Sequence, residues 1–507
     1  MKRFWIIALL LTFAALGLRL YVSLHVTSDC SGDGPVYQQI GMNVLQHGAY
    51  SMDDKAPYAP TFIRMPGYPL VLAAVFGLFG RGNLTALHVV QSVVDTGTCW
   101  LVGLLCFLCA PGGWEAAKRR RAVLWAFLLA ALCPFTFVYT GTMLTETWAL
   151  FFGTLCVTAG VWALKAEGRG LLRWAAAGVA GGVACLFRPD LGLFLAALGA
   201  LLLWAWVAEA RGEMKKAGGW RAALPATKRT FISGLALSLA FAAALAPWAI
   251  RNAVRFHLFQ PLAPAAANMP GEFVAYGYGA WVRTWIARPK DVEVFIWDVE
   301  SLPVDVAKLP ADACDSPQER QRVEALFERY NKGDLTGTAS PQGVPELVIT
   351  PAMDAEFGAI ARERVRNHPL RQYLLLPARR AWNMWFDTHS IYYPFDGDLL
   401  PLSALDPSVG QPVLLPLFYL LSWLYTVLGL AGAWVWWRSP ECRRWAVLMA
   451  LLFIPRLAFL SSIPNPEPRY MVELFPVFAA AGGAALASAR WLRLRRVAPA
   501  PVLRGAS

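Results

Sequence analysis

Polar residues that could do chemistry gather at the ends of long apolar segments in this sequence. Asp33 lies just after the first apolar run, in the stretch SDCSGDGPVYQQIGMNVLQHGAY at residues 28 to 50. A lone carboxylate beside a hydroxyl can take its proton, which is general-base chemistry. Arginines at other segment ends offer planar guanidinium groups that suit a phosphate or pyrophosphate. The set is Asp33 and Arg64, Glu146 in MLTETW, Arg188 and Asp190 in FRPD, Arg251 and Asn252 in APWAIRN, and Glu467, Arg469 and Tyr470 in NPEPRYM.

These residues also have structural explanations. Asp33 precedes an amphipathic helix whose apolar positions, from Val36 to Leu45, follow helical spacing and which stops at Gly48, so spacing alone favours an N-cap. The two roles are compatible, because a cap is held rigidly while its second oxygen can face a substrate. A single arginine at a segment end is more often an interfacial anchor. Four arginines on the same side of a membrane also suit a binding cavity in which a lipid head group meets water.

The elements that must position these residues are membrane helices. The chain has 507 residues, of which 57% are hydrophobic and only 16% charged, with a mean hydropathy of +0.43. This composition indicates an integral membrane protein. The net charge of +12 lies in short basic clusters between apolar runs, a pattern that fixes membrane orientation, so we expect no nucleic-acid partner.

About ten apolar runs are long enough to cross a bilayer, which takes roughly 17 to 25 residues. They are Phe4–Val26, Leu84–Ala110, Ala122–Thr140, Thr147–Leu164, Leu171–Phe187, Leu191–Val207, Phe231–Ile250, Val413–Trp436, Trp445–Ser462 and Met471–Ala487. The run at 68–80 is short, and we expect it to lie on the outer surface. Every short basic cluster then falls in the cytoplasm, as the positive-inside rule requires. Both termini are expected there, and the polar set on the outer face.

The expected fold class is all-α and polytopic, with amphipathic surface helices and a small exported region. We divide the chain into a first membrane part at 1–250 with an outer loop at 27–83, an exported lobe at 251–411, and a second membrane part at 412–507 with a basic cytoplasmic tail. Only Asp95 and Arg456 stand out as charges within the spans. Two such charges are too few to define a transport pathway.

The sequence resembles the type C glycosyltransferases, specifically the dolichyl-phosphate-mannose protein mannosyltransferase superfamily (glycosyltransferase family 39) with its bacterial lipid A aminoarabinose-transferase relatives. The similarity rests on LRLYVS, DGPVYQQIGMNVLQHGAY, RMPGYPLVLAAVFGLFG, MLTETW, CLFRPD, APWAIRNAVRFHLFQPL and NPEPRYMVELFPVF. They occur in the family's order along nearly the whole chain, least clearly across 290–360. Each motif is weak alone, and together they are specific.

The resemblance implies an enzyme of the cell membrane that moves a sugar from a polyprenyl-phosphate donor to an outer-face acceptor, with inversion. The acceptor would be a glycolipid, a polysaccharide or a protein. The family's catalytic acid falls on Asp33, although many relatives have Glu where this chain has Gly34. The family's basic residue falls on Arg64, before the altered turn MPGYP. We expect substrate to be bound by Arg64, Tyr68, Glu146, Arg188, Arg251, Asn252, Glu467, Arg469 and Tyr470.

No cofactor is expected, because the sequence has neither a P-loop nor a Rossmann fingerprint. The six histidines are scattered without ligand spacing, so no metal is supported either. A lipid-linked saccharide transporter or flippase is the alternative function, and it would need polar groups along a transmembrane groove. An acyltransferase or polymerase that acts on the same carrier lipids is a third alternative.

Overall fold

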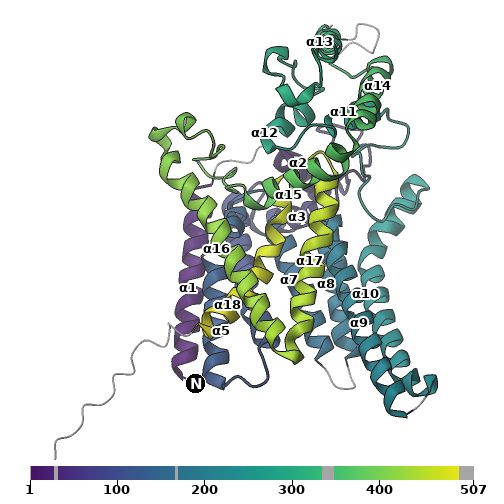
Figure 1. Cartoon of the computed structure of the whole chain (residues 1–507). Helices are drawn as coiled ribbons and strands as arrows, with labels where there is room; N and C mark the ends of the chain where they lie inside the picture. The colour runs from purple at the N-terminus through teal and green to yellow at the C-terminus, as the bar shows by residue number, and fades with distance from the viewer. Residues whose placement is uncertain (1, 28–31, 166–169, 218, 334–346, 490–507) are drawn as a thin grey trace, which may run out of the picture.

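A computed structural model describes residues 2–27, 32–165, 170–217, 219–333 and 347–489, and within them the secondary structure is helical, with no strand. A bundle of long apolar helices carries a lobe of shorter helices at one end (Figure 1). We call this the lobe end of the bundle. The N-terminus lies at the opposite end, as does the turn between the ninth and tenth α-helices. The predicted fold class, an all-α polytopic protein, is confirmed.

Eight helices among the described residues are long and apolar enough to cross a membrane. They are α1 (Lys2–His25), α4 (Leu84–Cys109), α7 (Glu146–Leu164), α9 (Gly192–Ala217), α10 (Leu224–Phe256), α16 (Gln411–Arg438), α17 (Arg443–Ser462) and α18 (Phe475–Ser488), which is entered through the 3-10 helix η11 (Pro468–Leu474). A ninth candidate is a bent pair, and α8 (Leu171–Phe187) is apolar but only 17 residues long. Together these elements correspond to the ten segments expected from the sequence.

The expected continuous span at 122–140 is wrong. α5 (Ala116–Ala131) ends before Pro134, and α6 (Pro134–Phe137) with η1 (Val138–Gly141) continues at an angle of 49°. Pro134 has no N–H to offer the carbonyl of Ala130, so the helical ladder breaks there. Arg19 of α1 donates to the carbonyls of Ala130 (3.3 Å) and Ala131 (3.1 Å), and its Nε pairs with Asp95 Oδ2 at 2.7 Å. The buried ion pair therefore satisfies the backbone groups that the break exposes.

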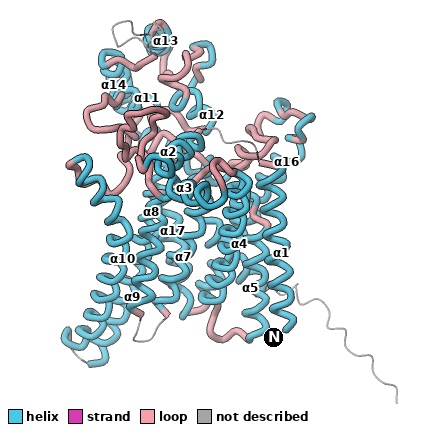
Figure 2. Tube along the Cα trace, turned by 180° about the vertical axis from the view of Figure 1, so that it is seen from behind, coloured by secondary structure: helices cyan, strands magenta, loops and turns pink. Residues whose placement is uncertain are grey.

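Two short helices lie across the lobe end of the bundle, α2 (Asp33–His47) and α3 (Gly67–Phe79), as Figures 1 and 2 both show. α3 has 13 residues, too few for a span, which agrees with the prediction for 68–80. The two helices pack closely, because a Cβ on Gly41 would come within 2.9 Å of the Pro69 carbonyl oxygen. This packing holds α2, whose first residue is Asp33, against α3.

The lobe has a hydrophobic core of its own. This core is formed by α11 (Tyr276–Val282), α12 (Pro289–Val292), α13 (Pro317–Asn331) and α14 (Pro351–Asn367), and its centre holds Trp281, Phe327 and Phe357. The next helix, α15 (Leu376–Phe386), packs Met384 and Trp385 on the core of the bundle instead. Buried Arg380 of α15 joins the lobe to the bundle, donating to the carbonyls of Arg283 and Ile286 at 2.7 Å and to Ser461 of α17 at 3.4 Å. The last bundle helix before the lobe, α10, ends at Phe256.

Candidate active site

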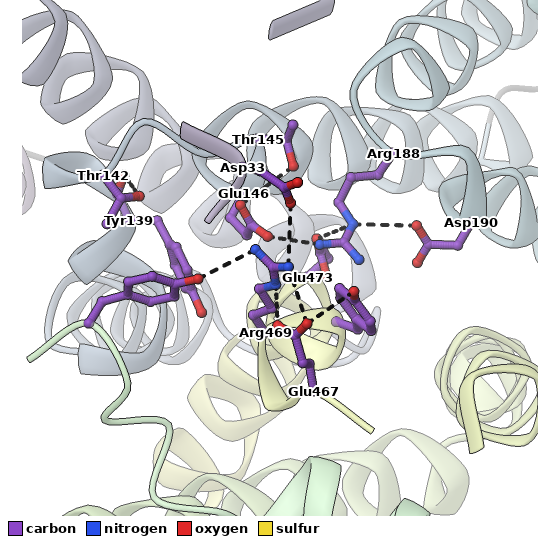
Figure 3. Close-up of polar contacts among 12 residues, drawn as sticks. Asp33, Tyr139, Thr142, Thr145, Glu146, Arg188, Asp190, Glu467, Arg469 and Glu473 are labelled. Carbon is purple, nitrogen blue, oxygen red and sulfur yellow. Dashed lines mark hydrogen bonds and ion pairs between the residues drawn. The ribbon is translucent and has the colours of Figure 1, made fainter. Parts of the chain in front are cut away.

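A cavity of about 820 Å³ opens at the lobe end, between α2, the start of α7, the turn from α8 to α9, and the segment that joins α17 to η11. Three carboxylates and two guanidinium groups line it: Asp33, Glu146, Asp190, Arg188 and Arg469. Figure 3 shows these side chains pointing toward one another from different helices. The remaining wall is mostly apolar, from residues such as Leu193, Leu262 and Phe459.

Asp33 is the first residue of α2, with Gly32 as the N-cap at a φ of 74°, a conformation that favours glycine. The prediction that Asp33 is itself the N-cap is therefore wrong. Its carboxylate faces the arginines instead: Oδ1 lies 2.8 Å from Arg64 Nη2, and Oδ2 lies 3.5 Å from Arg469 Nη2. The side chain is 28% exposed, so it is held between two positive charges and still reaches solvent.

Arg469 lies in η11 and is largely buried. Its Nε pairs closely with Glu467 Oε2, its Nη2 donates to Glu467 Oε1 at 3.2 Å, and its Nη1 donates to the Tyr392 hydroxyl at 3.4 Å. Tyr470 also donates to Glu467 Oε1, at 3.2 Å. Burial raises the pKa of Glu467, while the neighbouring Arg469 opposes that shift. Glu467 thus orients Arg469 toward Asp33.

Arg188, at the end of α8, forms the second positive centre. It donates to Glu146 Oε1 at 2.9 Å and to Asp190 Oδ1 at 3.3 Å, and it lies 3.3 Å from Glu473 Oε1. Its guanidinium also sits 4.7 Å from the centre of the Tyr470 ring, in a cation–π contact. Three carboxylates therefore contact the Arg188 guanidinium group, and the Tyr470 ring covers one of its faces.

Arg456 of α17 supports this centre from within the bundle. Its Nη2 lies 2.6 Å from Asp190 Oδ2 and 2.8 Å from Glu473 Oε2, and its side chain is fully buried. Asp190 and Glu473 each bridge Arg188 and Arg456, so the four charges form a closed network. Such a network holds its members in fixed positions, which is what a preorganised binding site requires.

Three of the expected site residues lie elsewhere. Arg251 donates to the carbonyl of Thr61 at 2.7 Å and to Asn252 Oδ1 at 2.8 Å, and Asn252 donates to the carbonyl of Gln260 at 2.7 Å. These contacts join α10 to the two loops beside the cavity. Tyr68 is fully buried, and its hydroxyl donates to Gln91 Oε1 at 3.0 Å. None of the three lines the cavity, and neither do Arg64 and Glu467, which contact the lining residues Asp33 and Arg469.

The structure also adds residues that the sequence reading left out. Glu473 is a charge inside the last span, and Arg19 lies inside the first, so the expectation that only Asp95 and Arg456 are charged within spans is wrong. Tyr392 comes from the loop after α15. The sequence signal for Glu473 was an isolated acid in an apolar segment, which indicates a buried partner. Nothing in the sequence pointed to Tyr392.

Within the described residues, no group of three His, Cys, Asp or Glu side chains is arranged to hold a metal ion. The carboxylates of the site bind guanidinium groups instead. The arrangement therefore offers a carboxylate that can accept a proton, two arginines beside it, and a third arginine across the cavity. An anion that enters can share these guanidinium groups with the carboxylates.

Three solved structures match this chain over nearly its whole length. The oligosaccharyltransferase of Archaeoglobus fulgidus, tethered with an acceptor peptide, matches 93% of this chain with 14% identity and a TM-score of 0.46. The oligosaccharyltransferase AglB of the same organism, in complex with an inhibitory peptide and a dolichol-phosphate, gives 13% identity and a TM-score of 0.43 over 95% of this chain. The chain spans about half the length of these archaeal proteins, 49% and 50%.

ArnT from Cupriavidus metallidurans, bound to undecaprenyl phosphate, matches 94% of this chain and 78% of its own length, with 14% identity and a TM-score of 0.36. No protein-family model and no curated protein matches the sequence.

Proposed function

We propose that this chain is an integral membrane glycosyltransferase that moves a sugar from a polyprenyl-phosphate carrier to an acceptor, with inversion and with Asp33 as the general base. The observation that carries the proposal is the position of Asp33. Its carboxylate lines a cavity at the lobe end and contacts Arg64 and Arg469, and Arg188 lines the same cavity. A base beside several fixed positive groups suits transfer from a phosphate leaving group.

The proposed step is a single displacement at the anomeric carbon. The acceptor oxygen attacks the face opposite the phosphate, its proton passes to Asp33, and the bond to the phosphate oxygen breaks, so the configuration inverts. The transition state has oxocarbenium character, as in glycoside hydrolysis. Negative charge grows on the leaving lipid phosphate, and preorganised guanidinium groups stabilise it. One carboxylate is enough, because a phosphate needs little protonation to leave.

Asp33 and the donor phosphate compete for the same guanidinium groups. Both oxygens of Asp33 face an arginine, Oδ1 toward Arg64 and Oδ2 toward Arg469. A phosphate that takes over part of the contact with Arg64 or Arg469 leaves Asp33 with fewer positive partners. The carboxylate is then free to accept a hydrogen bond from the acceptor hydroxyl that it deprotonates.

The cavity walls suit a molecule with a polar head and an apolar tail. The charged residues gather on one side, while Phe459, Leu460 and Ile463 form the wall toward the outside of α17. Phe459 is half exposed on the bundle surface, so the apolar wall continues to where lipid would contact the protein. A polyprenyl chain would leave the cavity along this wall.

A transporter fits these residues less well. The network around Arg188 and Arg469 lies at one end of the bundle, and the buried pair of Arg19 with Asp95 is sealed within the hydrophobic core. Reconstituted proteoliposomes separate the two functions. Given a radiolabelled polyprenyl-phosphate sugar and an envelope extract as acceptor, the chain should form labelled product. Translocation of labelled lipid without transfer would contradict the proposal.

The orientation belongs to the same proposal. Both termini are cytoplasmic, and the cavity opens on the outer face of the cell membrane, where a glycolipid, polysaccharide or protein acceptor is available. Mass spectrometry of cell-envelope glycans from a deletion strain identifies both the sugar and the acceptor, because the missing residue appears as a defined mass difference.

A further inference from the structure

A second large cavity lies at the end of the bundle opposite the candidate active site. It has a volume of about 990 Å³ and is enclosed by the end of α7 and the start of α8, by the second half of α9, and by the first turns of α10 and α17. Figure 1 shows the turn between α9 and α10 at this end, away from the lobe. The cavity shares no residue with the first one, so the sugar-transfer proposal does not account for it.

The walls of this cavity are mainly apolar and open toward the bundle surface. Leu172 is 83% exposed, and Ile232 is also exposed, so the rim presents aliphatic side chains where lipid would surround the bundle. Trp206 is held in place because its indole N–H donates to Thr227 Oγ1 at 3.0 Å. A rigid aromatic wall beside exposed aliphatic side chains suits hydrocarbon chains.

The polar side of the cavity is positively charged. Lys228, Arg229 and Arg444 line it against a single carboxylate, Glu209, which pairs closely with Arg229. Two cations therefore remain uncompensated by the lining residues. Arg444 lies over the Trp445 ring at 4.4 Å, and its buried Nε has no hydrogen-bond partner among the described residues. Lys228 forms no ion pair with any described residue. Both groups are available to an anion.

We propose that this cavity binds an anionic phospholipid, with the phosphate between Lys228 and Arg444 and the acyl chains against Trp206 and Leu172. A basic pocket between membrane helices near the membrane surface is the kind of site that anionic lipid head groups occupy. The apolar walls favour a lipid over a soluble phosphate, and the surplus of two positive charges favours an anionic over a zwitterionic head group. The site is independent of the sugar-transfer reaction.

Native mass spectrometry of the detergent-purified full chain tests the proposal, with dioleoyl phosphatidylglycerol and dioleoyl phosphatidylcholine as probes. Phosphatidylglycerol should be retained in preference. The double variant Lys228→Gln with Arg444→Gln should lose about thirtyfold in phosphatidylglycerol affinity, because each interfacial cation is expected to contribute roughly fivefold. The control variant, Lys215→Gln with Arg438→Gln, removes two exposed cations outside the cavity and should retain the lipid.

A second pair of variants, which changes side-chain size and not charge, keeps the test decisive if removal of the charges harms folding. Ala205→Trp fills the cavity without a change of charge and should also lose the lipid, whereas Ala208→Trp on the exposed face of α9 should not. Melting temperatures identify any unfolded variant. Equal retention of both lipids by the unaltered chain would overturn the proposal. So would an equal loss in the control variants, or displacement of the lipid by millimolar inorganic phosphate.

Discussion

The substitution Asp33→Asn separates the proposed base from its structural surroundings. Asn keeps the shape of the side chain but cannot accept the proton of an acceptor hydroxyl. General-base catalysis typically contributes a factor of about 10² to 10⁴. At about 1.36 kcal/mol per factor of ten, this corresponds to roughly 2.7 to 5.4 kcal/mol of activation free energy. We expect kcat for sugar transfer to fall by that factor.

The contacts of Asp33 predict how the loss divides between kcat and KM. The carboxylate lies 2.8 Å from Arg64 and 3.5 Å from Arg469, so it competes with the donor phosphate for both guanidinium groups. Asn removes this competing charge, so KM for the donor should stay unchanged or fall. A lower kcat without a higher KM is the signature of a group that acts in the transition state rather than in donor binding.

The assay is transfer from a radiolabelled polyprenyl-phosphate sugar in proteoliposomes, with melting temperature measured on the same preparation. Asp53→Asn is the matched control, because Asp53 belongs to the same loop but outside the cavity, where its Oδ2 accepts from Ser51 Oγ at 3.1 Å and Ala59 N at 2.6 Å. Normal turnover of Asp33→Asn would refute the proposed base. The proton acceptor would then have to be Glu146, Asp190 or Glu467.

Three further predictions test the neighbouring groups and the topology. Arg64→Ala and Arg469→Ala should each raise the donor KM by the equivalent of about 1.5 to 3 kcal/mol, because each variant loses a charged hydrogen bond to the donor phosphate. Unchanged donor kinetics in both variants would mean that the two arginines are only interfacial anchors. Arg456→Gln leaves two buried carboxylates without this partner and should destabilise the fold by about 3 to 5 kcal/mol, measured as a lower melting temperature; an unaltered melting temperature would contradict the network. Reporter fusions should give an outside signal after Gly82 and an inside signal after Arg121, and the reverse at Arg121 would invert the topology.

Much of the architecture followed from local patterns. A run of 17 or more apolar residues has few alternatives to a buried or membrane helix, so most spans were predicted within a few residues. The helices α9 and α10 continue well beyond the expected ends at 207, 231 and 250. The short run at 68–80 forms a 13-residue helix across the lobe end, and its length together with the charge pattern predicted a surface helix there. The break in the span at 122–140 was not predicted, although Pro134 is a sequence signal for it. Proline alone does not decide the matter, because membrane helices tolerate it when other groups satisfy the backbone.

The candidate site was likewise predicted in part from the sequence. The motifs around residues 33, 146, 188 and 469 predicted site residues that do line one cavity. Each of these residues stands at or near the end of a span, where polar groups meet water. Arg251 and Asn252 stand at such an end too, yet they tie loops together instead. A position at a span end does not say toward which neighbour a side chain turns.

The sequence by itself determined that the chain is a helical membrane protein and that its polar residues collect at span ends, because apolar length and charge act locally along the chain. Only the tertiary structure decided that the Asp33 carboxylate contacts Arg64 and Arg469 and does not cap its own helix. It also decided that Glu473 and Arg456 close a network around Arg188. These contacts join segments far apart in the sequence. Their geometry depends on how the helices pack, and no local pattern encodes that packing.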